Sequence, residues 1–173
     1  MTWEECIEKG KTYKTIVITG CQRTGTTYTA KELARVLGYV HYDEDNYGTH
    51  SFERFMNVLN KDENKVIQSP ALLHKMGELP EDVMIVMMIR DEDDVAKSMV
   101  RLGWFKTYGN KEYCLYKKDE LKTPQQLYRT KIEFGRQLQL DELDYNELKK
   151  TENYVEDRSK FTNLKQVRNN QPQ

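Results

Sequence analysis

The segment from Gly20 to Thr27 reads Gly-Cys-Gln-Arg-Thr-Gly-Thr-Thr and has the composition of a phosphate-binding loop. Its two glycines lie five positions apart, and glycine adopts positive φ angles without a steric penalty, so the backbone can wrap closely around an anion. The amides of such a loop and the N-terminus of a following helix provide hydrogen-bond donors and partial positive charge. Arg23 adds a cation, and Thr26 and Thr27 add hydroxyl groups. We therefore expect a phosphate or sulfate site here; the alternative is a glycine-rich turn that only starts a helix.

The residue after the second glycine separates this loop from that of nucleoside triphosphatases. Those proteins carry a lysine at this position, and the lysine reaches the β- and γ-phosphates of the nucleotide. This chain has Thr26 instead. The substitution argues against ordinary hydrolysis of ATP or GTP.

A second candidate anion site combines Arg90 with Ser98. Arg90 follows the apolar run Val83–Ile89, which predicts a buried parallel strand. An arginine at the carboxyl end of such a strand points toward the crevice where parallel α/β sheets bind ligands. Ser98 falls two turns inside the next predicted helix, so both residues can contact one phosphate. The alternative is an ion pair for Arg90 and an ordinary helix position for Ser98.

The elements around these residues alternate between strand and helix, which predicts a three-layer α/β fold with a parallel sheet of about four to five strands. The predicted strands are Thr15–Thr19, Tyr39–Tyr42, Lys65–Gln68 and Val83–Ile89. The predicted helices are Thr2–Gly10, Tyr28–Leu37, Ser51–Leu59, Pro70–Met76, Asp91–Arg101 and Pro124–Leu140. The acidic stretch Asp43–Gly48 is predicted as a loop after the second strand.

Length and composition favour one domain, residues 1–165, followed by a disordered tail, residues 166–173. The 173 residues carry 27 Lys plus Arg against 28 Asp plus Glu, so net charge gives no reason to expect nucleic-acid or membrane partners. Three cysteines without metal-ligand spacing indicate no disulfide framework and no zinc site. The polar N-terminus lacks the apolar run of a signal peptide, so we expect a cytoplasmic protein.

Together the two motifs resemble those of sulfotransferases, including the carbohydrate, protein-tyrosine and small bacterial or viral kinds. The loop matches that family's G-x-x-[RK]-[ST]-G-T-[TS]. Residues 90–98 match the start of its R-[DN]-P-x-D-x-x-x-S-x-x-x-R motif except that Glu92 replaces proline, and Arg101 lies one position before the place of the motif's last arginine. The resemblance is good over residues 15–45 and 83–101 and poor elsewhere. Residues 66–70 resemble a third-strand K-x-P segment without its lysine, and residues 143–148 resemble a Y-E-D-L stretch that follows a late strand.

The resemblance implies a P-loop fold of the nucleotide-kinase kind that binds 3′-phosphoadenosine 5′-phosphosulfate and releases 3′-phosphoadenosine 5′-phosphate, with no metal required. The implied 5′-phosphosulfate ligands come from the loop, and the implied 3′-phosphate ligands are Arg90 and Ser98. The whole predicted binding set is Gly20, Gln22, Arg23, Thr24, Gly25, Thr26, Thr27, Arg90 and Ser98.

Sulfuryl transfer also requires a base for the acceptor's proton and a cation for the leaving group. Arg23 is the candidate for the leaving group. The family places a catalytic glutamate after the second strand, where this chain offers Glu44 as first choice, His41 as second and Asp43 as third. A solvated acidic loop is the alternative. Trp104 and Phe105 are candidates for a loop over the adenine or the acceptor, and neither the acceptor nor the oligomeric state can be predicted.

Two other functions remain open at this point. A P-loop kinase for a small molecule or nucleotide would share the fold and use Asp91 as a magnesium ligand. A nucleotide-binding module without catalysis is the other alternative, since the chain is short for a sulfotransferase.

Overall fold

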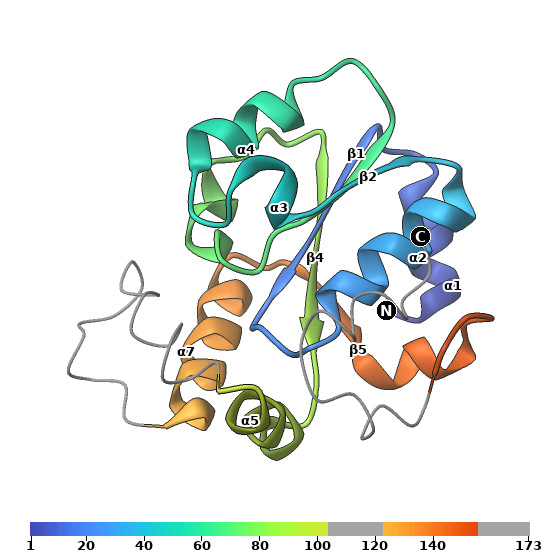
Figure 1. The fold of residues 1–173 in the computed structure, drawn as a ribbon. Helices are drawn as coiled ribbons and strands as arrows, with labels where there is room; N and C mark the ends of the chain where they lie inside the picture. The colour runs from blue at the N-terminus through green and yellow to red at the C-terminus, as the bar shows by residue number, and fades with distance from the viewer. Residues whose placement is uncertain (104–122, 156–173) are drawn as a thin grey trace.

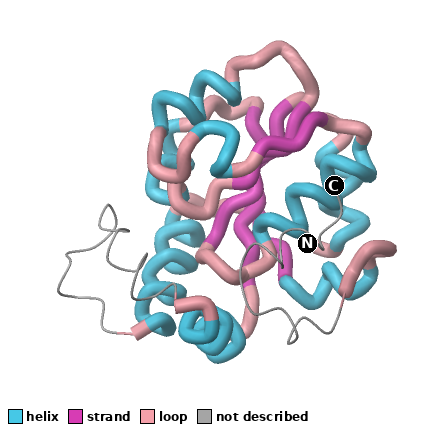
Figure 2. The backbone as a smooth tube through the Cα atoms, in the orientation of Figure 1, coloured by secondary structure: helices cyan, strands magenta, loops and turns pink. Residues whose placement is uncertain are grey.

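One parallel sheet forms the centre of the structure, a computed structural model that describes residues 1–103 and 123–155. Its five strands pair in the order β2-β3-β1-β4-β5, and every pair is parallel. The strands are β1 (Thr15–Gly20), β2 (Val40–Tyr42), β3 (Lys65–Gln68), β4 (Val83–Ile89) and β5 (Asp141–Asp144). Helices cover both faces of the sheet (Figures 1 and 2). The predicted α/β architecture is therefore confirmed.

One face of the sheet is covered by α1 (Trp3–Gly10), α2 (Thr26–Leu37) and the 3-10 helix η3 (Tyr145–Lys150). Alternate residues of a strand point to opposite faces. The even-numbered residues of β1 and β4 therefore pack beneath these helices, against side chains that include Leu33 and Leu148.

The opposite face carries α3 (Glu44–Tyr47), α4 (Phe52–Leu59), the 3-10 helix η1 (Leu73–Glu78), α5 (Glu92–Arg101) and α7 (Pro124–Gln137). Odd-numbered strand residues such as Val17 and Met87 pack against this layer. Helices α5 and α7 lie side by side at the bottom of the view in Figure 1, next to the carboxyl end of β4. They flank the edge of the sheet where the candidate site lies.

Local sequence signals explain where several helices begin. Thr2 and Glu5 form a reciprocal capping box at the start of α1. Thr123 and Gln126 do the same for α7, whose first residue is Pro124. These helix starts are readable because each depends on contacts within one turn of chain.

Four predicted segments differ from the structure. The loop predicted at residues 43–48 contains α3, because Asp43 accepts a hydrogen bond from the Asp45 amide and the buried Tyr47 anchors the turn. The helix predicted from Pro70 is instead η1, which begins at Leu73. Helix α7 ends at Gln137 rather than Leu140. The sequence predicts no strand at residues 141–144. Only Leu143 of the four residues of β5 is buried, and pairing with β4 stabilises the strand.

Some predictions fall outside the described residues. Trp104 and Phe105 belong to the segment 104–122, and the tail at 166–173 belongs to the segment 156–173. Among the residues that the structure does describe, no helix has both the length and the apolar character needed to cross a membrane.

Candidate functional site

The predicted phosphate loop joins the end of β1 to the start of α2, as the sequence indicated. Three of its residues have positive φ angles: 133° at Gly20, 71° at Arg23 and 91° at Gly25. The Thr24 hydroxyl donates to the Cys21 carbonyl at 2.6 Å and stabilises the tight turn. Gly25 is the N-cap of α2 and no side chain caps that helix, so its first amides face the loop without a side-chain acceptor. This arrangement suits an anion.

Both glycines of the loop are required by close packing. A Cβ atom at Gly20 would lie 2.8 Å from the Met88 carbonyl oxygen, and one at Gly25 would lie 2.9 Å from the Tyr145 ring. The loop is therefore held between β4 on one side and η3 on the other. Its shape depends on elements that follow it by more than sixty residues in the chain.

Arg23 connects the loop to the second predicted anion site. Its Nε atom donates to the Ser98 hydroxyl at 2.9 Å, and its carbonyl oxygen accepts from Nη1 of Arg90 at 3.1 Å. The two motifs, about 70 residues apart, thus meet at the carboxyl edge of the sheet. One small region holds two guanidinium groups and a hydroxyl, and such groups bind phosphate and sulfate oxygens.

Arg90 is positioned by two tyrosines. The Tyr128 hydroxyl accepts from the Arg90 amide at 3.0 Å and donates to the Arg90 carbonyl at 2.5 Å. The guanidinium carbon lies 4.0 Å from the centroid of the Tyr145 ring, in a cation–π contact. The Nε atom of Arg90 is buried, and within the described residues it has no hydrogen-bond partner. A bound anion would provide the missing acceptor.

Gln68, at the end of β3, joins the loop to the candidate base. Its amide nitrogen donates to the Thr26 hydroxyl at 3.2 Å, and its amide oxygen accepts from the Glu44 backbone at 3.4 Å. The Glu44 carboxylate accepts from the Ala71 amide at 3.2 Å. Glu44 therefore lies beside the phosphate loop, one side chain away from Thr26.

The structure does not bring the other two candidate bases to this cluster. His41 pairs with Val66 in the sheet, at the level of Ile16, which precedes Gly20 by four residues or roughly 13 Å along a strand. Burial lowers the pKa of His41 below its usual value, against an opposing effect of Asp43. The Asp43 side chain caps α3 instead of pointing an open carboxylate at the loop.

The remaining predicted residues occupy the loop and the first turn of α2. Thr27 lies half-buried in that turn. Gln22 accepts a hydrogen bond from Nζ of Lys131 at 3.1 Å. Lys131 comes from α7 and its side chain is completely buried.

Sequence reasoning missed Gln68, Tyr128 and Lys131 as contributors to the site. Lys131 alone left a signal: it falls on the apolar stripe of α7 that buries Leu127, Ile132 and Gly135. A lysine at such a position is rarely buried without a partner. The other two are ordinary strand and helix residues, and only their contacts reveal them.

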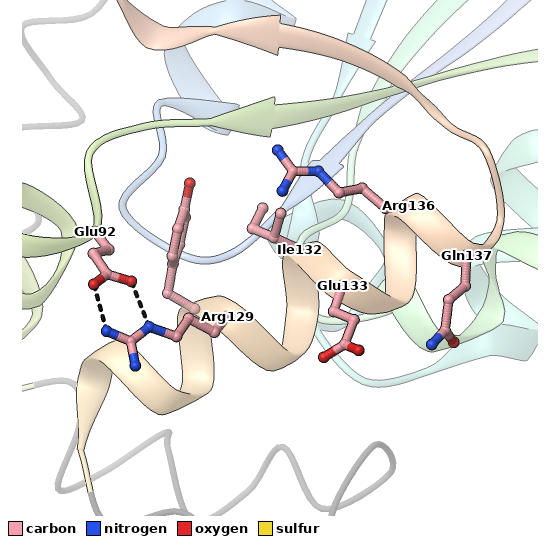
Figure 3. Close-up of a pocket in the computed structure, with 7 residues that line it drawn as sticks. Glu92, Arg129, Ile132, Glu133, Arg136 and Gln137 are labelled. Atoms are coloured by element: carbon pink, nitrogen blue, oxygen red, sulfur yellow. Dashed lines mark hydrogen bonds and ion pairs between the residues drawn. The ribbon is translucent and has the colours of Figure 1, made fainter.

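A groove of about 570 Å³ lies along α7 (Figure 3). Glu92 and Arg129 form a two-hydrogen-bond ion pair at one end, at 2.6 and 2.7 Å. Glu133, Arg136 and Gln137 line the other end. Tyr128 also lines the groove while its hydroxyl contacts the Arg90 backbone, so this one residue borders both the groove and the anion site.

The parallel sheet, the glycine-rich loop between β1 and α2, and the site at the carboxyl edge define an α/β P-loop fold. Comparison with solved structures finds a shikimate kinase from Acinetobacter baumannii in complex with shikimate, at 17% identity and a TM-score of 0.45, covering 82% of this chain and 83% of the other. No family model matches the sequence, and no curated protein matches it.

Proposed function

We propose that this protein transfers the sulfuryl group of 3′-phosphoadenosine 5′-phosphosulfate to a hydroxyl or amine of an acceptor. The observation that carries the proposal is the contact of Arg23 with both Ser98 and Arg90, formed around a phosphate loop that lacks lysine. A ligand that suits this arrangement bears one anionic group for the loop and another for Arg90 and Ser98. The 5′-phosphosulfate and 3′-phosphate of this nucleotide supply the two groups.

In this proposal the loop amides, Arg23 and the hydroxyls of Thr26 and Thr27 bind the 5′-phosphosulfate. Arg90 binds the 3′-phosphate through its guanidinium group, whose buried Nε then gains an acceptor. Ser98 already contacts Arg23, so a single hydroxyl would link the two anionic groups. Charge-assisted hydrogen bonds of this kind are stronger than neutral ones.

The transfer step needs an in-line attack on sulfur by the acceptor oxygen or nitrogen. The new bond joins the acceptor atom to sulfur, and the bond that breaks joins sulfur to the bridging phosphate oxygen. That oxygen keeps the electron pair and leaves as part of 3′-phosphoadenosine 5′-phosphate. Arg23 and the loop amides stabilise its negative charge. The acceptor's proton passes to the base, and no metal takes part.

Glu44 is the proposed base because of its place beside Thr26 through Gln68. Its hydrogen bond from the Ala71 amide stabilises the charged carboxylate, the form that accepts a proton. Catalytic hydrogen bonds are often longer before substrate binds, and the distance from Glu44 to the acceptor is set when the acceptor binds.

A P-loop kinase is the second candidate because it would have the same loop and sheet. Asp91, which follows Arg90 directly, lies just after the end of β4. A kinase would need the Asp91 carboxylate as a magnesium ligand. Here one of its oxygens accepts the amides of Asp93 and Asp94 at 3.0 and 3.1 Å and caps α5. Threonine at position 26 also removes the lysine that contacts the β- and γ-phosphates. A nucleotide-binding module without catalysis would bind the same ligand and transfer nothing.

Calorimetric titration of the purified protein separates these functions. The ligands are 3′-phosphoadenosine 5′-phosphate, ADP and ATP, each with and without magnesium. Magnesium-independent binding of the bisphosphate, at least tenfold tighter than ADP, supports the sulfonucleotide site. A preference for ATP with magnesium would replace it with the kinase. A mixture of candidate acceptors with labelled donor then tests for transfer. The same reaction without an added acceptor gives the background hydrolysis of the donor.

A further inference from the structure

Lys131 is a fully buried lysine whose ammonium group lies between two loops of the candidate site. Its Nζ atom donates to the Gln22 side-chain oxygen at 3.1 Å and to the Pro70 carbonyl oxygen at 3.1 Å. Gln22 belongs to the phosphate loop after β1, and Pro70 belongs to the loop after β3. These two strands are neighbours in the sheet. One side chain from α7 therefore joins the two loops.

The second loop also holds the candidate base. Ala71 follows Pro70 directly, and its amide donates to the Glu44 carboxylate at 3.2 Å. Any displacement of Pro70 changes the position of that amide. Through Pro70 and Gln22, the Lys131 ammonium thus fixes both the anion-binding loop and the residue that supports Glu44.

The energetic context points to a functional reason for a lysine here. Burying an ammonium group is expensive, and a well-packed apolar side chain of similar volume is often neutral or more favourable for stability. A cation at this place becomes favourable when an anion occupies the neighbouring loop, which has threonine where related loops carry lysine.

We propose that Lys131 is a positioning residue that holds the phosphate loop and the Pro70 loop in their anion-binding arrangement and adds positive charge beside the bound anion. The inference rests on the part of the proposed function that assigns an anion to the phosphate loop. It requires neither a sulfuryl group nor catalysis. It predicts that Lys131 affects ligands with and without a 3′-phosphate by the same factor, because its contacts are on the 5′ side of the site.

The test uses the full chain with Lys131→Met, which keeps the length of the side chain and removes its charge and its donors. Ile132→Val, one residue along the same helix and buried, is the matched control. The readouts are affinity for 3′-phosphoadenosine 5′-phosphate, ADP and pyrophosphate, the melting temperature, and hydrogen exchange of peptides that cover residues 20–25 and 69–71.

We expect Lys131→Met to lose at least tenfold in affinity for each ligand that the wild type binds, while a cooperative thermal transition shows that the variant is folded. Exchange in both loops should accelerate in this variant and not in Ile132→Val. Affinity within twofold of the wild type, or unchanged exchange in both loops, would overturn the proposal. Hydrogen exchange is measured without ligand, so it tests Lys131 even if the wild type does not bind the bisphosphate. Failure of the wild type to bind would count against the proposed function instead.

Discussion

The Nε atom of Arg23 lies 2.9 Å from the hydroxyl oxygen of Ser98, although 75 residues separate the two in the chain. This contact brings a loop after β1 together with a helix after β4. Arg23 has a φ angle of 71°, a conformation that is uncommon for residues other than glycine. A non-glycine residue in this region at a loop that faces a crevice is typical of a functional site. Arg90 also contacts Arg23, because its Nη1 atom donates to the Arg23 carbonyl oxygen at 3.1 Å.

Replacing Arg90 with alanine should lower affinity for 3′-phosphoadenosine 5′-phosphate by about 100-fold, since losing a charged hydrogen-bonding group costs about 3 kcal/mol. The affinity for ADP, which has no 3′-phosphate, should change far less. Titration calorimetry of both ligands on both proteins gives the two ratios. An equal loss for the two ligands would remove Arg90 from the 3′-phosphate site.

The ring of Tyr145 should contribute to nucleotide affinity, because it packs against the Arg90 guanidinium in a cation–π contact. Tyr145→Phe keeps that ring and should bind the bisphosphate within about twofold of the wild type, whereas Tyr145→Leu should lose about fivefold, the value of a cation–π contact of about 1 kcal/mol. The same pair of titrations measures this. If Phe and Leu behave alike, the stacking contributes nothing to the anion site.

Changing Glu44 to glutamine should preserve nucleotide binding and reduce transfer at least 100-fold, because general-base catalysis contributes about 100- to 10,000-fold. The glutamine oxygen can still accept from the Ala71 amide, so the local structure is kept. Turnover is measured with labelled donor once an acceptor is known, and Asp45→Asn on the same helix is the control. Unchanged turnover in Glu44→Gln would remove Glu44 as the base.

Stability should fall in acid through His41. Burial lowers the pKa of this imidazole below its usual value of 6.5, so the unfolded chain binds the proton more readily than the folded one. The free energy of unfolding should therefore decrease as the pH falls below about 6.5, by up to about 1.4 kcal/mol per pH unit. Urea unfolding from pH 8 to pH 5.5 measures it. The slope should be shallower in His41→Gln, and identical slopes would contradict the assignment.

Gly25→Ala tests the packing of η3 on the phosphate loop. The new Cβ atom would lie 2.9 Å from the Tyr145 ring at a φ angle of 91°, so we expect a loss of about 2–3 kcal/mol in unfolding free energy together with loss of nucleotide binding. Gly38→Ala is the control: its φ angle is also positive, at 69°, but nothing lies within 4 Å of the added atom. Equal destabilisation of the two variants would show that the φ angle alone matters, without the contact.

Elements whose signals are local could be predicted from the sequence. The β-branched run Thr15–Thr19, the apolar run Val83–Ile89 and the glycines of the phosphate loop each predict their structure from residues a few positions apart, and the structure has β1, β4 and the loop there. The parallel sheet follows from the alternation of strands and helices. That Arg90 and Ser98 bind one phosphate stays a prediction; in the structure each of the two contacts Arg23.

The surroundings of these elements depend on contacts that form only in the folded chain. Strand β5 is too polar to be recognised in isolation and exists because β4 supplies its hydrogen-bond partners. Gln68 and Lys131 reach the loop from β3 and α7. Their roles depend on contacts between residues far apart in the chain. Periodicity and motif spacing describe which face of an element is buried, and they carry no information about which distant side chain meets it there.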